Sequence, residues 1–158
     1  MNPPQNPDGH TIPVREPNRG PVLGLDLGDA RIGVAISDED LRLAVPVGTV
    51  HVGQPPGELV AIAELVRERG VTRIVVGLPL TLRGEHGSRA AHAEAFTEAL
   101  ASVVAVPIET QDERLSTVEA ERALGAAGSR GRERRRVVDA SAAAVILQAW
   151  LDTHRRNG

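Results

Sequence analysis

The sequence predicts an α/β fold in which a mixed five-stranded sheet is flanked by helices. Three short apolar stretches between residues 22 and 52 follow one another across turn-forming residues, which predicts an antiparallel meander. From residue 57 onward, helical and strand-like patterns alternate, as expected where two further strands join a sheet in parallel. A long amphipathic stretch at residues 137–154 predicts a C-terminal helix.

The first three strands are expected from their apolar content and their spacing. Residues 22–28, VLGLDLG, and residues 31–37, RIGVAIS, flank a tight turn, which favours an antiparallel hairpin. Residues 44–52, AVPVGTVHV, add a third strand beside the hairpin.

The middle of the chain shows the two periodicities of an α/β protein. Residues 57–70 carry apolar side chains at helical spacing and end at Gly70, a residue type that commonly caps helices. Residues 73–80, RIVVGLPL, form a continuous apolar run, as expected for a strand that is covered on both faces. The Ala-rich residues 88–103 predict a second helix, and residues 106–110, VPIET, predict a fifth strand.

The last third of the chain combines a capped helix, a linker and the C-terminal helix. Ser116, followed three residues later by Glu119, matches a capping box and predicts a helix over residues 116–124. The Gly- and Arg-rich residues 125–136 are expected to be a mobile linker. Right-handed crossovers place the two later strands beside the first strand, and that arrangement is ribonuclease H-like.

The composition predicts a single domain of an internal protein. The 158 residues suffice for one ordinary domain, which we place at residues 21–154 after a disordered, Pro-rich tail at residues 1–20. The chain has no cysteine, which excludes disulfides and thiolate zinc sites and favours a reducing, cytoplasmic compartment. No apolar run approaches the length of about 20 residues that spans a membrane, so no membrane partner is expected.

Acidic residues occur where the predicted elements begin or end. Asp26 closes the first strand, Asp112 and Glu113 follow the fifth strand, and Asp139 lies near the start of the last helix, on its apolar face. Ligands of such sheets gather at the carboxyl ends of the parallel strands, where Asp26 is expected. If the carboxylates converge, Mg²⁺ or Mn²⁺ ions neutralise their repulsion, and two such ions can promote phosphodiester hydrolysis. The pattern therefore predicts a metal-dependent nuclease.

Each carboxylate also has a purely structural interpretation. Asp26 lies in an apolar strand, where an acidic side chain is disfavoured, although it could instead bind backbone amides of the next turn. A turn cap that pairs with Arg114 is the favoured role for Asp112, whereas Glu113 is evenly balanced between the two interpretations. Asp139 could stabilise the positive end of a helix dipole, but its place on the apolar face argues against this.

The choice between Asp112 and Glu113 depends on strand geometry. Neighbouring residues of an extended segment face opposite sides, so only one of the two can turn toward Asp26 and Asp139. Leu115 would share the side of Glu113 and pack beneath it. We therefore expect Glu113 to be the ligand and Asp112 to point outward.

One basic segment favours a local contact with nucleic acid. The net charge of −3 gives no overall attraction, so such binding requires a local patch. Residues 130–136, RGRERRR, are often no more than a solvated linker, but here they closely precede Asp139. Phosphate groups over the metal site could be held by Arg132, Arg134, Arg135 and Arg136.

Four segments of the chain belong together: GLDLGDARIGVAISD, VVGLPL, DERLST followed by EAERAL, and VVDASAAAVILQAWL, which span essentially residues 22–152. In order and spacing they resemble the YqgF family of Holliday junction resolvases and pre-16S rRNA processing nucleases. The family is similar to RuvC-type resolvases, so the resemblance implies a ribonuclease H-like fold and an acidic metal site. Position by position, it implies Asp26, Glu113 and Asp139 as catalytic metal ligands. RuvC-type enzymes take one carboxylate from the end of the fourth strand, where this chain reads GLPL, so Glu113 would substitute from the next strand.

The resemblance implies two substrates, a four-way DNA junction and the 5′ end of immature small-subunit ribosomal RNA. Paired cleavage of a junction calls for a symmetric dimer. Because the sequence shows no obvious dimer face, we expect a monomer or weak homodimer that acts on pre-rRNA.

Two other functions compete with a nuclease. One alternative is an ATP-binding domain of the actin and hexokinase type, which shares the Gly-x-Asp-x-Gly opening but needs two lobes. The other is a non-catalytic RNA-binding factor for ribosome assembly.

Overall fold

The computed structural model describes residues 20–54, 56–78, 87–112 and 131–156, with residues 131–139 and 155–156 described by their backbone alone. In this part of the chain, no helix is long and apolar enough to cross a membrane. Several expectations lie outside the described residues: the tail before residue 20, the strand tip at residues 79–80, and the capped helix at residues 116–124.

Five strands of the described residues form one mixed sheet in the order β3-β2-β1-β4-β5. β1 pairs antiparallel with β2, and β2 pairs antiparallel with β3. β4 is parallel to β1, and β5 is parallel to β4. The predicted meander with two added parallel strands is thus confirmed. The strands are β1 (Val22–Leu27), β2 (Arg31–Ser37), β3 (Ala44–His51), β4 (Arg73–Leu78) and β5 (Ile108–Asp112).

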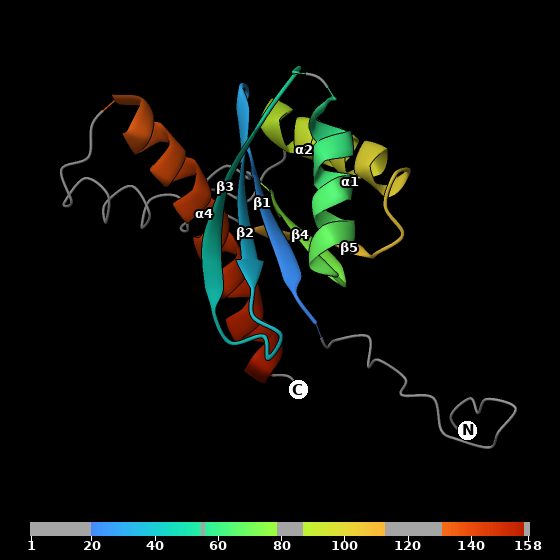
Figure 1. The fold of residues 1–158 in the computed structure, drawn as a ribbon, viewed down its shortest axis with the longest axis vertical. Coiled ribbons are helices and arrows are strands. Elements are labelled where there is room, and N and C mark those ends of the chain that lie inside the picture. The colour runs from blue at the N-terminus through green and yellow to red at the C-terminus, as the bar shows by residue number, and fades with distance from the viewer. Residues whose placement is uncertain (1–19, 55, 79–86, 113–130, 157–158) are drawn as a thin grey trace, which may run out of the picture.

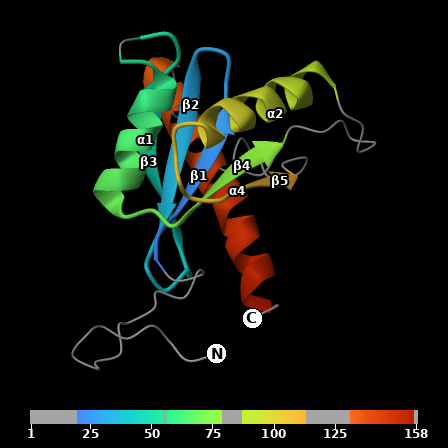
Figure 2. The same ribbon diagram turned by 90° about the vertical axis from the view of Figure 1, so that its right-hand side faces the viewer.

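Helices cover both faces of the sheet, as Figure 1 and the turned view in Figure 2 show. α1 and α2 lie on one face, and α4 crosses the other face. We call these faces the α1/α2 face and the α4 face. The helices are α1 (Glu58–Arg69), α2 (Ser88–Ala101) and α4 (Gly131–Arg156).

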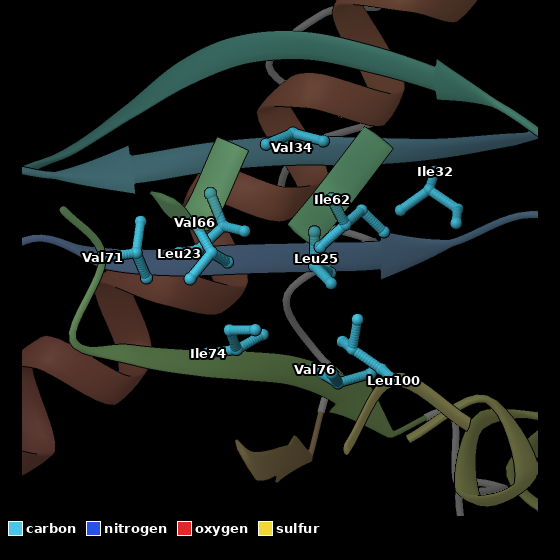
Figure 3. Close-up of a cluster of buried hydrophobic side chains, with 10 residues drawn as sticks. All are labelled: Leu23, Leu25, Ile32, Val34, Ile62, Val66, Val71, Ile74, Val76 and Leu100. Atoms are coloured by element: carbon cyan, nitrogen blue, oxygen red, sulfur yellow. The ribbon is translucent and has the colours of Figure 1, made fainter. Parts of the chain in front are cut away.

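The α1/α2 face carries the larger hydrophobic core (Figure 3). Ile62 and Val66 of α1 pack there against alternating residues of the central strands, so the apolar face predicted for this helix is confirmed. Gly70 ends α1 in the left-handed conformation, with φ of 63°, as its predicted role as a cap requires. The strand residues of this core are Leu23, Leu25, Ile32, Val34, Ile74 and Val76.

The α4 face carries the second core. Val22, Ala35 and Val75 of the sheet pack there against α4. The helix residues of this core are Ala143, Ile146, Leu147, Trp150 and Leu151. β1 and β4 are therefore buried on both faces, as the unbroken apolar run of β4 predicts.

Two predicted boundaries are wrong. The fifth strand begins at Ile108 and includes Asp112, because Asp112 still pairs with Leu78 of β4. α4 begins at Gly131, so residues 131–136 are helical and do not form a linker. Arg and Glu are good helix formers and residues 132–156 contain no Gly or Pro, so this segment continues the helix.

Candidate active site

Asp26 lies near the carboxyl end of β1, as the sequence predicts. Val22 and Gly24 precede it at two-residue spacing, and both face α4. A Cβ atom on Gly24 would lie 2.7 Å from Cβ of Leu147, which shows how closely the helix approaches. Because side chains alternate along a strand, the partly buried Asp26 also belongs to the α4 face.

Glycines flank Asp26 on both neighbouring strands. Gly33 of β2 pairs with Asp26 directly. On the other side, Leu25 pairs with Val76, so Gly77 is the position of β4 that lies level with Asp26. Neither neighbouring strand therefore places a side chain beside the carboxylate. Glycine in a strand commonly marks a place where a ligand or another backbone approaches closely, so this environment suits a hydrated metal ion.

α4 lies antiparallel to β1, with its N-terminal half toward the Asp26 end of the strand (Figure 1). Val22, at the start of β1, shares a cluster with Trp150, whereas Gly24 lies against the carbonyl oxygen of Ala143. Asp139 is four residues before Ala143, about one helical turn farther in the same direction. The backbone of α4 thus carries position 139 toward Asp26.

Asp139 does not lie at the positive end of α4. The helix begins at Gly131, more than two turns before Asp139. The effect of a helix dipole is confined to the first turn, so the dipole interpretation of Asp139 does not apply. Its predicted apolar face is confirmed, because Ala142, Ala143 and Ile146 are fully buried.

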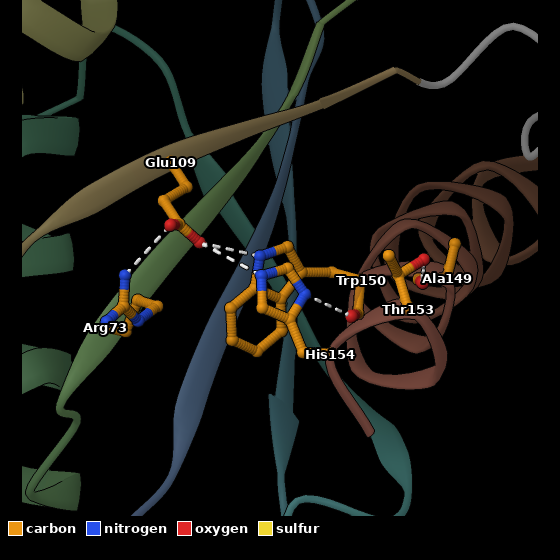
Figure 4. Close-up of polar contacts among 6 residues, drawn as sticks. All are labelled: Arg73, Glu109, Ala149, Trp150, Thr153 and His154. Carbon is orange, nitrogen blue, oxygen red and sulfur yellow. Dashed lines mark hydrogen bonds and ion pairs between the residues drawn. The ribbon is translucent and has the colours of Figure 1, made fainter. Parts of the chain in front are cut away.

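Asp112 belongs to the face opposite to Asp26. Glu109 of β5 bonds to Trp150 of α4, which places Glu109 on the α4 face (Figure 4). Alternation along β5 then directs Gln111 to the α4 face and Asp112 to the α1/α2 face. Asp112 ends β5 and does not follow it, contrary to the predicted boundary.

The predicted set of three carboxylates is only partly described by the structure. Glu113 lies outside the described residues, and Asp139 is described by its backbone alone. Among the side chains that are described, no three acidic or histidine groups gather closely enough to hold a metal ion. The assignment of Asp26, Glu113 and Asp139 as metal ligands therefore stays a prediction.

The basic segment belongs to the first turns of α4. Arg132, Arg135 and Asp139 follow one another at spacings of three and four residues, which fall on one side of a helix. The segment therefore leads into the position of Asp139 as a continuous helix.

A polar cluster at the other end of α4 was not predicted from the sequence. Glu109 accepts a hydrogen bond of 2.7 Å from Nε1 of Trp150 and lies 3.1 Å from Nη1 of Arg73 (Figure 4). His154 stacks on Trp150, with 3.8 Å between the ring centroids. Trp150 and His154 are one helical turn apart, and this spacing is a weak sequence signal for their contact. Arg73 and Glu109 come together only through the pairing of β4 with β5, which the sequence does not show.

A small hollow on the other side of the Asp26 strand was also not predicted. It has a volume of about 250 Å³ and lies at the carboxyl end of β1, beside the start of α2. Its lining residues are Leu27, Asp29, Ser88, Arg89 and His92. Leu27 follows Asp26 and belongs to the α1/α2 face, so this hollow is separated from the Asp26 carboxylate by the sheet.

Comparison with known proteins identifies the family. A family model described as RuvX, Holliday junction resolvase, matches residues 20–153. The chain is a member of the RuvX family. The RuvX family is the same as the YqgF family that the four sequence segments resemble. RuvX membership makes the chain a member of a nuclease family.

Curated relatives match the chain over most of its length. A protein of Chloroflexus aggregans is 49% identical over 138 residues, which cover 87% of this chain and 97% of the relative. A protein of an Anaeromyxobacter species is 52% identical over 130 residues, which cover 82% of this chain and 95% of the relative. Both relatives are named, provisionally, as pre-16S rRNA nucleases.

A solved structure confirms the ribonuclease H-like fold of this RuvX member. T. thermophilus RuvC in complex with a Holliday junction substrate superposes with a TM-score of 0.54 at 17% sequence identity. The match covers 88% of this chain and 98% of the RuvC chain. At this identity the likeness concerns the fold alone.

Proposed function

We propose that this chain is a metal-dependent nuclease that hydrolyses phosphodiester bonds and processes the 5′ end of pre-16S rRNA. The observation that carries the proposal is the position of Asp26. It lies at the carboxyl end of β1, on the face that α4 covers and between Gly33 and Gly77. A carboxylate with a glycine beside it on each neighbouring strand, at the ligand-binding end of a parallel sheet, suits a divalent cation.

The catalytic roles belong to three carboxylates. Asp26, Glu113 and Asp139 would hold Mg²⁺ or Mn²⁺, which are cations that favour carboxylate oxygens. Bound divalent ions supply an activated water molecule and stabilise the charge on the leaving oxygen of a phosphodiester. Asp26 contributes from a rigid central strand, and Asp139 from a helix that packs on that strand through alanines.

The basic segment would bind the substrate strand. Arg132, Arg134, Arg135 and Arg136 precede Asp139 in α4, so a phosphate backbone held there would pass over the carboxylates. Contacts of this kind position a nucleic acid without reading its sequence.

The pre-16S rRNA substrate is supported by the names of relatives that are about half identical to this chain. A ribosomal RNA substrate would also agree with the expected cytoplasmic location. The second candidate substrate is a four-way DNA junction, which is favoured by the description of the matching family model. Matched cleavage of a junction would require a symmetric dimer, whereas we expect a monomer or weak homodimer.

The deciding experiment compares both substrates with one protein preparation. The purified protein is incubated with a 5′-extended 16S precursor and with a synthetic four-way junction, in Mg²⁺, in Mn²⁺ and in chelator. We expect metal-dependent cleavage of the precursor. If the protein cleaves only the junction, the four-way junction is its substrate and the precursor is not. Activity that persists in chelator would overturn the metal dependence.

Variants at the end of β1 and in the turn that follows it test the site. Asp26→Asn should abolish cleavage and leave the thermal melt intact, because the amide keeps the shape and removes the charge. Asp29→Asn is the control, because Asp29 is exposed and lines the hollow beside α2. Full activity of Asp26→Asn would refute the site. If cells depleted of the native protein grow when they express Asp26→Asn, this result would instead favour the non-catalytic assembly factor.

A further inference from the structure

We propose that Gln111 is a substrate-positioning residue whose amide hydrogen-bonds to the sugar-phosphate backbone beside the scissile bond. The inference rests on the proposed nuclease function and adds a residue to the site. Its basis is a row of residues that lie level with one another on three neighbouring strands. In this row, Gly77 of β4 separates Asp26 of β1 from Gln111 of β5.

The orientation of Gln111 follows from its neighbours on β5. Glu109, two residues earlier, faces α4 because it accepts the hydrogen bond from Trp150. Ile108 packs in the core on the α1/α2 face. Alternation therefore directs Gln111 to the α4 face, the same face as Asp26.

The strand register places Gln111 level with Asp26. Gln111 pairs with Gly77 of β4, and Gly77 is level with Asp26 because Leu25 pairs with Val76. Two strand spacings, about 10 Å in total, therefore separate the backbones at Gln111 and Asp26. The glycine between them has no side chain, so the described strands place no side chain between the carboxylate and the amide, and the distance suits one phosphate or ribose.

Among the described residues, α4 leaves the β4 and β5 part of this row largely uncovered. α4 packs chiefly over β1, β2 and β3 and makes few contacts with β4 and β5. Its contact with β5 centres on Glu109, which Trp150 holds. Gln111 lies two residues farther toward the carboxyl end of β5 and is only partly buried.

The amide of Gln111 is available for a ligand. Among the described residues, its side chain has no hydrogen-bond partner, whereas Glu109 on the same strand face is held by Trp150 and Arg73. A glutamine amide offers two N–H donors and one acceptor without a charge. It can therefore bond to a non-bridging phosphate oxygen or to a ribose 2′-hydroxyl, and it does not compete for the metal ions as a carboxylate would.

The test measures steady-state kinetics on the 5′-extended 16S precursor in Mg²⁺. Gln111→Ala should raise KM by roughly three- to tenfold, the effect of one lost hydrogen bond, with little change in kcat or in the melting temperature. Gln111→Glu keeps the shape of the side chain but places a negative charge beside the substrate phosphates. The repulsion should raise KM further. Thr110→Ala is the matched control, because Thr110 is exposed and faces the opposite side of β5.

A second substrate distinguishes the two candidate hydrogen-bond partners of Gln111, a phosphate oxygen and a ribose 2′-hydroxyl. This substrate is the same precursor with 2′-deoxyribose at the nucleotides that flank the cleavage site. If the KM effect of Gln111→Ala disappears on it, the partner is the 2′-hydroxyl, and if the effect persists, the partner is the phosphate.

Three outcomes would overturn the assignment. An unchanged KM for Gln111→Ala on a precursor that the wild-type protein cleaves would refute the role of Gln111 alone. A loss of thermal stability that accompanies the kinetic loss would show a structural role. A wild-type protein that cleaves no nucleic acid would refute the proposed function, and the role of Gln111 with it.

Discussion

Trp150 donates a hydrogen bond of 2.7 Å from Nε1 to Oε2 of Glu109, and this bond ties the C-terminal half of α4 to the edge strand β5 (Figure 4). Arg73 of β4 lies 3.1 Å from the other carboxylate oxygen, so three elements meet at one side chain. The same bond shows which face of β5 lies toward α4. By alternation, Gln111 belongs to the face that carries Asp26, and Asp112 belongs to the opposite face.

Trp150→Phe should lower the stability of the protein without removing the apolar ring. The variant leaves Glu109 with Arg73 but without the indole N–H, which we expect to cost about 1 kcal/mol, or a few degrees in melting temperature. Thr153→Ala is the control, because it removes an exposed hydrogen bond within the same helix, from Oγ1 to the carbonyl of Ala149. Equal melting temperatures for the two variants would show that the bond from Trp150 to Glu109 is not a stabilising tie.

Glu113→Gln and Asp112→Asn should affect different properties. Asp112 faces the α1/α2 face, so its neutral variant should alter chiefly stability. Glu113→Gln should lower metal-dependent kcat by about two orders of magnitude or more, as loss of a metal ligand does. Single-turnover kinetics and thermal melts on both variants check this. An inactive, well-folded Asp112→Asn beside an active Glu113→Gln would reverse the assignment.

Gly24→Ala should displace α4 from the sheet. The added Cβ would lie 2.7 Å from Cβ of Leu147 and 3.1 Å from the carbonyl oxygen of Ala143, so the helix must shift. Overpacking of this kind costs about 1–3 kcal/mol. Activity should fall more than stability explains, because the displaced helix carries Asp139. Gly87→Ala is the control, because a Cβ there meets no atom of the described residues within 4 Å.

Neutralising the basic segment should weaken binding to nucleic acid regardless of sequence. With Arg132, Arg134, Arg135 and Arg136 all changed to Gln, the slope of log affinity against log salt should fall by up to about 3. Gln is a good helix former, so circular dichroism should show that α4 is kept. Filter binding of the precursor across a salt series measures the slope. A slope equal to that of the wild-type protein would remove the arginines from the substrate path.

Asp38 should stabilise the loop between β2 and β3 in a pH-dependent way. Backbone N–H groups of Arg42, at 2.7 Å, and Leu43, at 3.3 Å, donate to Oδ1 of Asp38. The hydrogen bond from Arg42 is the main cause that lowers the pKa of this carboxyl below its ordinary value of 3.8. A lowered pKa means stability that is present above pH 3.8 and is lost as the pH falls through the folded-state value.

The measurement for Asp38 is a series of melts from about pH 6 to about pH 3. Asp38→Asn should melt below the wild-type protein at the upper end, and the difference should close toward the lower end. Glu39→Gln is the control, because Glu39 is the exposed neighbour in the same loop. A difference that stays constant over the whole range would contradict the assigned cause.

Local patterns alone were enough to predict most of the elements. The alternating and continuous apolar runs of β1, β2 and β4 correspond to strands that are buried on one or both faces, and Gly70 ends α1 where its freedom to adopt positive φ predicts. Within the described residues, the basic segment is the larger of two exceptions, the other being the bounds of β5. Gly residues and crowded like charges suggest a linker, but high helix propensity within residues 131–136 and continuity with the packed part of α4 prevail.

The sequence by itself determined that Asp26 lies near the end of a buried strand and that Asp139 continues the apolar face of a helix, because both properties depend on periodicity within one element. Only the tertiary structure decided that Gln111 lies level with Asp26, that Gly33 and Gly77 flank it, and that Asp112 faces the other way. The physical reason is that alternation shows which residues of a strand share a face. The strand register and the bond from Trp150 to Glu109 show which face that is.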